Sequence, residues 1–303
     1  MKFGKLENIE EVDFSLPLDP LGNAKVLTGH VPTTKQLYIG CTGWSMKEWV
    51  AKVYPKGTKS KDYLHAYAKQ FNTIELNTTH YRIPNVETID KWRKESAEDF
   101  KFCPKVPQAI SHRKDLGLSS QNLRLFWDSI AGLDEKLGCC FIQLPPHFGL
   151  QKIALLEQLL EIWPHSIPLA VEVRHASWFE TPEASRQFLN LLTKYQKAAV
   201  ITDVAGRRDV LHMGVTCPIA MIRFVGNGLH KSDYERSDAW KQRLEKWYAQ
   251  GLTAAYFFTH EPDNILAPEL AAYLHSIAQF IPEVQTRGPK FIEDQGEQLS
   301  LFG

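Results

Sequence analysis

Residues 139–175 read CCFIQLPPHFGLQKIALLEQLLEIWPHSIPLAVEVRH, and this stretch decides the fold class. Its ends, 139–146 and 169–175, are short continuous apolar runs, as expected of parallel strands that are covered on both faces. Between them, residues 152–163 place apolar side chains at the i, i+3, i+4 spacing of an amphipathic helix. The stretch therefore predicts a strand–helix–strand unit of an α/β fold.

The same rhythm recurs along most of the chain. Apolar runs stop at polar, Gly or Pro residues, and segments with helical periodicity, such as residues 119–138, follow them. The further predicted strands are residues 37–45, 73–81, 100–106, 198–204, 219–228 and 254–262. Eight strands close a barrel, so we predict a single (β/α)8 barrel of the TIM type. An open, doubly wound sheet is the alternative, but no Gly-rich phosphate fingerprint follows the first strand.

Length and composition fit one large domain. The chain has 303 residues, of which 44% are hydrophobic. Residues 1–34 are polar and have no clear period, so we expect an irregular N-terminal extension that wraps the exterior or remains mobile. Residues 35–282 should form the barrel, and residues 283–303 a flexible tail.

Charge and cysteine content narrow the class of protein. Lys plus Arg and Asp plus Glu both total 35, which removes any global attraction to nucleic acid or anionic membranes. The N-terminus lacks the apolar run of a secretion signal and no stretch reaches membrane-spanning length, so we expect a cytoplasmic protein. The five cysteines are odd in number and show no paired C-x-x-C spacing, which indicates buried, reduced thiols.

Polar residues at the C-terminal ends of the strands are candidates for function, because active sites of (β/α)8 enzymes form there. We assign acid/base or charge-stabilising roles to Glu75, Lys105, Glu172 and Asp203. The alternative is a buried ion-pair network that plugs the barrel. The predicted substrate-binding residues are Thr42, Trp44, Asn77, Tyr81, Gln143, Arg174, His175, Trp178, Arg223, Asn227 and His260.

The character of these residues favours an anionic ligand over a metal. No H-x-x-x-H or equivalent cluster occurs, and Arg174 beside Glu172 indicates that this carboxylate is already neutralised. We therefore predict no cofactor and disfavour a divalent metal. Arg and His residues on one set of loops suit phosphate or an organic anion. Trp44, Tyr81 and Trp178 offer flat surfaces for a sugar or base. The alternative for all three is core packing beneath the loops, which we weigh equally for Trp178.

Several motifs occur in a fixed order with long gaps between them. They are CTGWS at 41–45, IELNTTHYRIP at 74–84, FCPKVPQAISH at 102–112, FIQLPP at 141–146, VEVRHASWF at 171–179 and MIRFVGNG at 221–228. This series resembles the YecE-like family, domain of unknown function 72, over roughly residues 37–280. The resemblance implies a barrel whose activity is unassigned. The chain departs from the family pattern at Val225 and at Thr259 and His260, so the resemblance carries no role to these positions.

The last residues suggest a partner. Gln298, Leu299, Leu301 and Phe302 resemble the short peptide with which bacterial repair and replication proteins bind the DNA sliding clamp. The alternative is that the apolar end packs on its own barrel.

The sequence leaves the reaction open. The first hypothesis is a hydrolase-like enzyme that acts on a phosphate-bearing or nucleic-acid-derived substrate at the C-terminal ends of the strands. The alternatives are a non-catalytic nucleic-acid or anion-binding module and a sugar isomerase or hydrolase.

Overall fold

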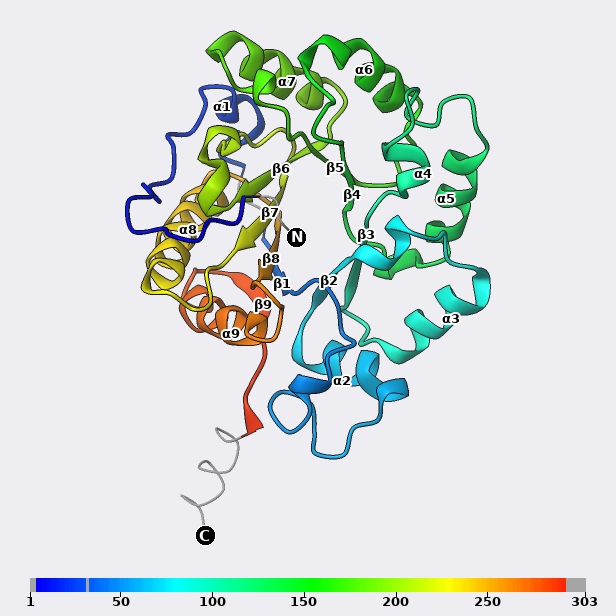
Figure 1. The fold of residues 1–303 in the computed structure, drawn as a ribbon, viewed down its shortest axis with the longest axis vertical. Helices are drawn as coiled ribbons and strands as arrows, with labels where there is room; N and C mark the ends of the chain where they lie inside the picture. Colours follow the sequence, from blue (N-terminus) through cyan, green and yellow to red (C-terminus); the bar gives the residue numbers. More distant parts are fainter. Residues whose placement is uncertain (1–3, 31–32, 293–303) are drawn as a thin grey trace.

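The computed structural model describes residues 4–30 and 33–292. In this part of the chain, seven parallel strands form one sheet in the order β4-β5-β6-β7-β8-β1-β9, and β2 pairs with β3 in a second parallel sheet (Figure 1). The strands are β1 Lys35–Gly40, β2 Thr73–Leu76, β3 Lys101–Pro104, β4 Cys140–Gln143, β5 Leu169–Glu172, β6 Ala198–Asp203, β7 Ile219–Val225, β8 Ala254–His260 and β9 Val284–Arg287.

The helices lie outside the strands (Figure 1). They are α1 Asn23–Val26, α2 Tyr63–Gln70, α3 Val86–Glu95, α4 Gln108–Ser111, α5 Asn122–Ala131, α6 Ile153–Ile162, α7 Pro182–Lys194, α8 Lys231–Ala249 and α9 Ala267–Ala278. Short 3-10 helices are η1 Lys47–Trp49, η2 Ser60–Asp62, η3 Asn77–His80, η4 Asp134–Lys136, η5 Leu150–Lys152, η6 Ala176–Trp178 and η7 Ala205–Val210. The helix predicted over 119–138 is shorter. It begins at Asn122 and ends at Ala131, and the chain then enters the separate 3-10 helix η4, where Asp134 has a positive φ.

All eight predicted strands occur in the predicted order, which confirms the α/β class and the parallel arrangement. The hydrogen-bonded sheet is not closed, however. Between β1 and β2 the Glu75 N–H donates to the Cys41 carbonyl at 3.0 Å, and between β3 and β4 isolated bridges include one that pairs Lys105 with Phe141. The predicted strand over 73–81 ends early, because the Thr79 hydroxyl donates to the Leu76 carbonyl within a 3-10 turn.

The ninth strand lies in the segment predicted to be a flexible tail. β9 pairs with the first residues of β1, with Lys35 opposite Val284 and Tyr38 opposite Arg287. Because β2 approaches only the end of β1, the first part of β1 has an open edge, which β9 covers. The prediction of flexibility from residue 283 is therefore wrong for β9.

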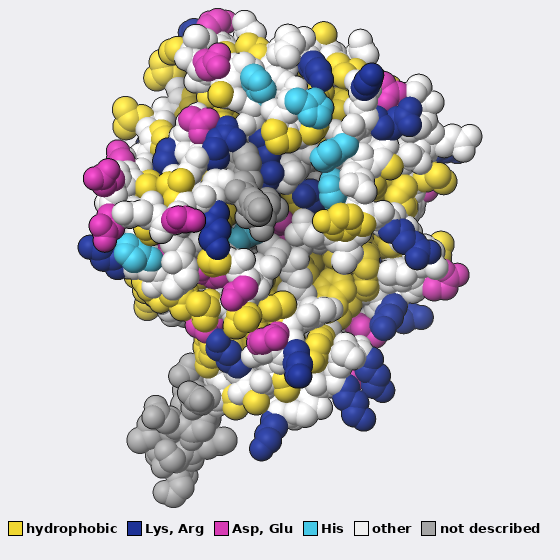
Figure 2. All heavy atoms as spheres, in the orientation of Figure 1, with side chains coloured by type: hydrophobic (Ala, Val, Ile, Leu, Met, Phe, Trp, Pro, Cys, Tyr) yellow, Lys and Arg dark blue, Asp and Glu magenta, His cyan; other side chains and the backbone are white. Residues whose placement is uncertain are grey.

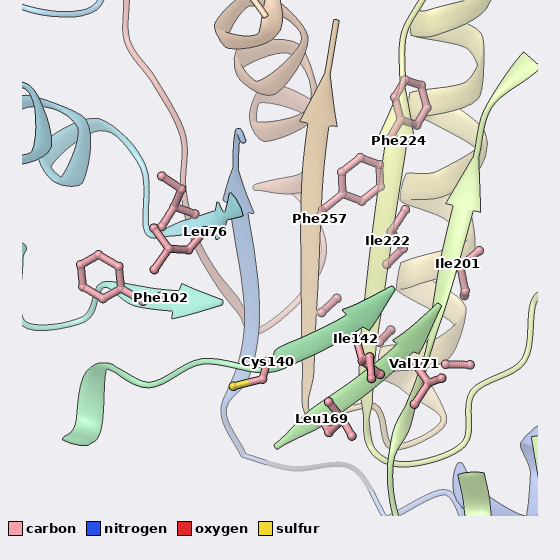
Figure 3. Packing of buried hydrophobic residues seen from close by; sticks show 14 of the residues in the cluster. Leu76, Phe102, Cys140, Ile142, Leu169, Val171, Ile201, Ile222, Phe224 and Phe257 are labelled. Atoms are coloured by element: carbon pink, nitrogen blue, oxygen red, sulfur yellow. The ribbon is translucent and has the colours of Figure 1, made fainter. Parts of the chain in front are cut away.

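Strand alternation divides the apolar core into two layers. Ile142, Val171, Ile201, Ile222 and Phe257 belong to the large cluster between strands and helices, shown in Figure 3. The alternate positions form a second, inner cluster, made of Cys103, Cys139, Phe141, Ala170, Ala198, Val200, Cys217, Met221, Tyr256 and Phe258. The inner cluster fills the space between the strands and supports the residues at their C-terminal ends.

The N-terminal extension is fastened to α8 and to η7. The Asp19 carboxylate accepts hydrogen bonds from Arg243 at 2.7 Å and from Lys246 at 2.6 Å. The Arg208 guanidinium donates to the Ser15 carbonyl at 2.9 Å. Asp19 and Ser15 therefore pack on the outside of the helices, as expected of an extension that wraps the exterior.

Candidate active site

One set of polar side chains stands directly above the inner cluster. Every second residue of a strand faces the same side, so each strand that contributes to this cluster continues inward with its next alternate residue. On β4 to β8 these residues are Gln143, Glu172, Thr202, Arg223 and His260. Glu75 on β2 and Lys105 after β3 join them through the contacts described below.

Arg223 links two buried carboxylates. Its Nε and Nη2 donate to the two oxygens of Glu75, both at 2.9 Å, and its Nη1 donates to Glu172 at 2.7 Å. Burial would raise the pKa of Glu75, but Arg223 and His260 outweigh it and hold that pKa well below its ordinary value. The pKa of Glu172 is likewise lowered, because Arg174 and Arg223 outweigh its burial. Both carboxylates are therefore ionised and poor proton acceptors.

Arg174 and Lys105 extend this cluster through Gln143. Arg174 donates to Glu172 at 2.7 Å and to the Gln143 side-chain oxygen at 2.7 Å. The Lys105 ammonium donates to the same oxygen at 3.1 Å and makes no ion pair within the described residues. Burial, and then repulsion by Arg223, lowers the pKa of Lys105 to about 8. Lys105 is thus a buried cation that lacks a counter-charge of its own.

His260 and Asn77 complete what we call the inner network, which consists of Glu75, Asn77, Lys105, Gln143, Glu172, Arg174, Arg223 and His260. His260 Nε2 lies 2.9 Å from one oxygen of Glu75, and the Asn77 amide donates to the other at 2.9 Å. All hydrogen-bonding positions of Glu75 face partners. The network contains the buried ion pairs that we weighed as an alternative to catalysis.

A cavity of about 520 Å³ opens beside the inner network. Thr42, Asn77, Arg174, Arg223 and His260 line it, together with the inward-facing Thr202 and with residues of the β7–α8 loop. The hydroxyl of Thr202 is buried and has no hydrogen-bond partner among the described residues. Figure 2 shows Lys, Arg and His side chains around the centre of this face. The cavity therefore combines buried charge with an unused polar group.

The N-terminal extension contributes to the cavity, although no functional role is predicted for it from the sequence. Gly4, Lys5, Leu6, Glu7 and Ile9 line one side. The Gly206 N–H donates to the Gly4 carbonyl at 2.8 Å and holds this segment in place. A β-carbon added to Gly206 would lie 2.8 Å from that carbonyl oxygen, so only glycine permits the contact without displacement. No periodicity in residues 1–34 signals this placement.

Asp203 does not join the inner network, contrary to the prediction. Asp203 follows Thr202 directly on β6, so its side chain points to the opposite face of the strand, toward α8. There it accepts hydrogen bonds from Arg208, from Arg236 at 3.1 Å and from the Trp240 indole at 2.8 Å. We call Asp203, Arg208, Asp233, Arg236 and Trp240 the outer network. Through these hydrogen bonds its carboxylates hold β6, η7 and α8 together. Asp203 is therefore not placed for catalysis at the cavity.

Within the inner network, Glu75, Lys105, Gln143 and Glu172 do not line the cavity themselves. Four further predicted residues belong neither to the network nor to the cavity lining. The Trp44 ring packs edge-on against Trp92, and the Tyr81 side chain is 75% exposed. His175 accepts the Ser177 N–H and caps η6, while the fully buried Trp178 donates to the Phe148 carbonyl at 2.7 Å. For Trp178, core packing was the alternative interpretation, and the structure shows that packing. Asn227, in contrast, lines the cavity as predicted, with its amide held by Asp233 at 3.0 Å.

Other groups in the described residues bear on metal and redox chemistry. No group of three or more His, Cys, Asp or Glu side chains in residues 4–30 and 33–292 could hold a metal ion. The absence of a cofactor remains a prediction. All five cysteines are buried and free, as expected. None of the described helices is long and apolar enough to cross a membrane.

One carboxyl group at the cavity was not assigned a role from the sequence. Glu261 follows β8 directly, lines the cavity and is only 4% exposed. Strand alternation places His260 inward and would therefore direct its neighbour Glu261 outward, away from the strands' interior. Glu261 nevertheless lines the cavity, because the β7–α8 loop forms the cavity wall beside it. The sequence pattern does not reveal the course of this loop.

Comparison with known proteins places this fold among related chains. A family model described as a protein of unknown function, DUF72, matches residues 38–290. The UPF0759 protein YecE of Escherichia coli is 31% identical over 267 residues, which are 82% of this chain and 95% of YecE. YunF of Bacillus subtilis is 32% identical over 154 residues, 48% of this chain and 53% of YunF. A solved DUF72 family protein from Enterococcus faecalis has a TM-score of 0.66 at 22% identity and covers 82% of this chain and 100% of that chain, which shows a shared fold.

Proposed function

The chain belongs to the DUF72 family, a family of unknown function, and we propose from its site that it is a hydrolase-like enzyme acting on a small phosphate-bearing or nucleic-acid-derived substrate. The proposal takes the strands to form a (β/α)8 barrel with two interrupted ladders, so that the cavity occupies the usual position of a barrel active site. The substrate would bind between the inner network and residues 4–9.

The charge of the inner network carries this proposal. Lys105, Arg174 and Arg223 are three buried cations, and they face two carboxylates, Glu75 and Glu172. With Lys105 protonated, the network keeps one positive charge in excess, and two of its cations, Arg174 and Arg223, line the cavity. A buried charge of this kind is costly unless an opposite charge meets it. A phosphate group would supply that charge and would accept hydrogen bonds from guanidinium groups.

The division of roles follows from the hydrogen bonds. Glu75 and Glu172 are occupied by Arg223 and Arg174, so they orient the cations and do not take protons from the substrate. Lys105, whose pKa of about 8 leaves a neutral fraction near neutral pH, supports proton transfer as well as anion binding. The unpartnered Thr202 hydroxyl supports a polar contact with the bound molecule.

Calorimetric titration with inorganic phosphate and with a nucleoside monophosphate, at low salt, tests the proposal. We expect the wild type to bind at least one of them, and Lys105→Met to bind at least about tenfold more weakly, about 1.4 kcal/mol. Lys231→Met is the matched control, because Lys231 is an exposed cation at the start of α8 outside the cavity. Equal weakening by both variants would indicate only general attraction, and no binding would favour a structural ion-pair plug.

Recruitment to the DNA sliding clamp is a separate proposal. Gln298, Leu299, Leu301 and Phe302 lie outside the described residues, so the sequence alone supports it. A synthetic peptide of residues 290–303 should bind the clamp with about micromolar affinity, and a Leu301→Ala, Phe302→Ala peptide should not. Equal binding by both peptides, or none by either, would remove this partner.

A further inference from the structure

The carboxyl group of Glu261 combines burial with an unused oxygen. Its Oε2 accepts the Gly228 N–H at 2.8 Å, whereas its Oε1 is buried and has no hydrogen-bond partner among the described residues. Buried polar atoms in folded proteins are almost always paired, so an unpaired carboxyl oxygen beside a cavity indicates a missing partner. This observation is independent of the charge on the inner network.

The β7–α8 loop is shaped around this group. A β-carbon added to Gly226 would lie 2.2 Å from Oε1, so glycine leaves the space that the carboxyl group occupies. The Asn227 N–H is taken by Asp233 at 2.8 Å, which fixes the loop from the other side. Gly226, Asn227 and Glu261 all line the cavity. The carboxyl group is therefore held in a defined position at the cavity wall.

The surroundings favour the protonated form of Glu261. Burial is the main cause that raises its pKa to about 7, and the nearby Asp233 adds to it, whereas the Gly228 and Leu229 N–H groups and Arg236 oppose it. The other groups that interact electrostatically with it include Arg236 and Tyr234 on α8 and Cys41 after β1. The charged or titratable residues that line the same cavity are Lys5, Glu7, Arg174, Arg223, His230 and His260. Glu261 makes no salt bridge with any of them within the described residues.

We propose that Glu261 is the group that donates a hydrogen bond, and then a proton, to an oxygen of the molecule bound in the cavity. In a hydrolysis the carboxyl O–H breaks as the proton moves to the leaving oxygen, which departs with its bonding electron pair. Water adds at the atom that loses this oxygen, and the proton it releases restores the carboxyl group. The step needs no reactant beyond substrate and water. It rests on the proposed function, because the same cavity must hold the ligand.

Sulfate is a suitable probe because it does not change its own charge between about pH 5.5 and about pH 8.5. We expect calorimetry to show that sulfate binding by the wild type weakens at least about tenfold as the pH rises through about 7, since deprotonated Glu261 repels the anion. Glu261→Gln keeps a neutral donor at every pH, so it should match the wild type at low pH and lose the part of the decline centred near pH 7. Only the later decline should remain, in which Lys105, with a pKa of about 8, loses its charge. His260→Gln should retain the wild-type decline, because Glu261 still titrates.

The outcomes separate the two proposals. Sulfate binding with the same decline in Glu261→Gln and in the wild type would overturn the role of Glu261 and leave anion binding intact. Absence of sulfate binding by the wild type at every pH would overturn both. If Glu261→Gln does not fold, Gly226→Ala replaces it, because its β-carbon would displace Oε1. A decline unchanged in that variant would count against Glu261 in the same way.

Discussion

The inner and outer networks are both buried clusters of carboxylates and arginines, yet they differ in charge balance and in what lies beside them. In the outer network, Asp203 and Asp233 face two cations, Arg208 and Arg236, and helix α8 covers the group. The inner network has three cations against two carboxylates and opens into a cavity. The balanced, covered cluster therefore holds elements together, whereas the unbalanced one beside a cavity is suited to bind an anion.

The largest expected effect is the loss of Arg223. Arg223→Met would leave Glu75 buried with only His260 and Asn77, and removal of one partner from a buried ion pair costs about 3–5 kcal/mol. The free energy of unfolding, from urea denaturation, measures this loss. Arg124→Met on the exposed face of α5 is the control and should change stability by less than about 0.5 kcal/mol. A loss below about 1 kcal/mol in Arg223→Met would contradict the account of the inner network.

The outer network should affect stability without affecting binding. Asp203→Ala removes the acceptor of the Arg236 and Trp240 hydrogen bonds, and we expect a loss of about 3 kcal/mol in unfolding free energy. Sulfate affinity should stay within about twofold of the wild type, because Asp203 does not face the cavity. An Asp203→Ala variant that folds but no longer binds sulfate would show that the outer network also takes part in anion binding, contrary to the difference drawn between the two networks.

Lys105 should make stability depend on pH. Its pKa of about 8 in the folded state is below the ordinary 10.5, so the unfolded chain binds this proton more tightly between the two values. The contribution of Lys105 to the free energy of unfolding is therefore least favourable below its folded pKa. It becomes more favourable as the pH rises between the folded and the unfolded pKa. Between about pH 7 and about pH 9.5, the wild type should gain about 2 kcal/mol relative to Lys105→Met, as measured by urea denaturation. Parallel pH profiles would show that Lys105 carries no buried, uncompensated charge.

The smallest effect concerns the N-terminal segment. Gly206→Ala would break the hydrogen bond to Gly4, and we expect a global stability change below about 1 kcal/mol, because the contact is local. Limited proteolysis should nevertheless cleave residues 4–9 faster. Gly43→Ala is the control, since a β-carbon there would meet no atom within 4 Å. Unchanged proteolysis in Gly206→Ala would show that this hydrogen bond does not hold the segment at the cavity.

The sequence predicts the strands well, because eight apolar runs bounded by polar, Gly or Pro residues are a strong local signal. It also predicts most of the inner network, since Glu75, Glu172 and Arg223 each interrupt an apolar strand. It fails at Asp203, because β6 is apolar on both faces and offers no mark of which residues point inward. Glu261 and residues 4–9 were not assigned a role, because loop courses and long-range contacts decide their positions. All of β9 was missed for the same reason, because its pairing with β1 is a long-range contact.

The most direct test of anion binding by the inner network is a crystal structure of the protein soaked with tungstate, which is an anion that anomalous scattering locates. We expect a tungstate in the cavity, between residues 4–9 and the inner network, within hydrogen-bonding distance of Arg174 or Arg223. An empty cavity with tungstate only on exposed loops, at a concentration that labels those loops fully, would contradict it.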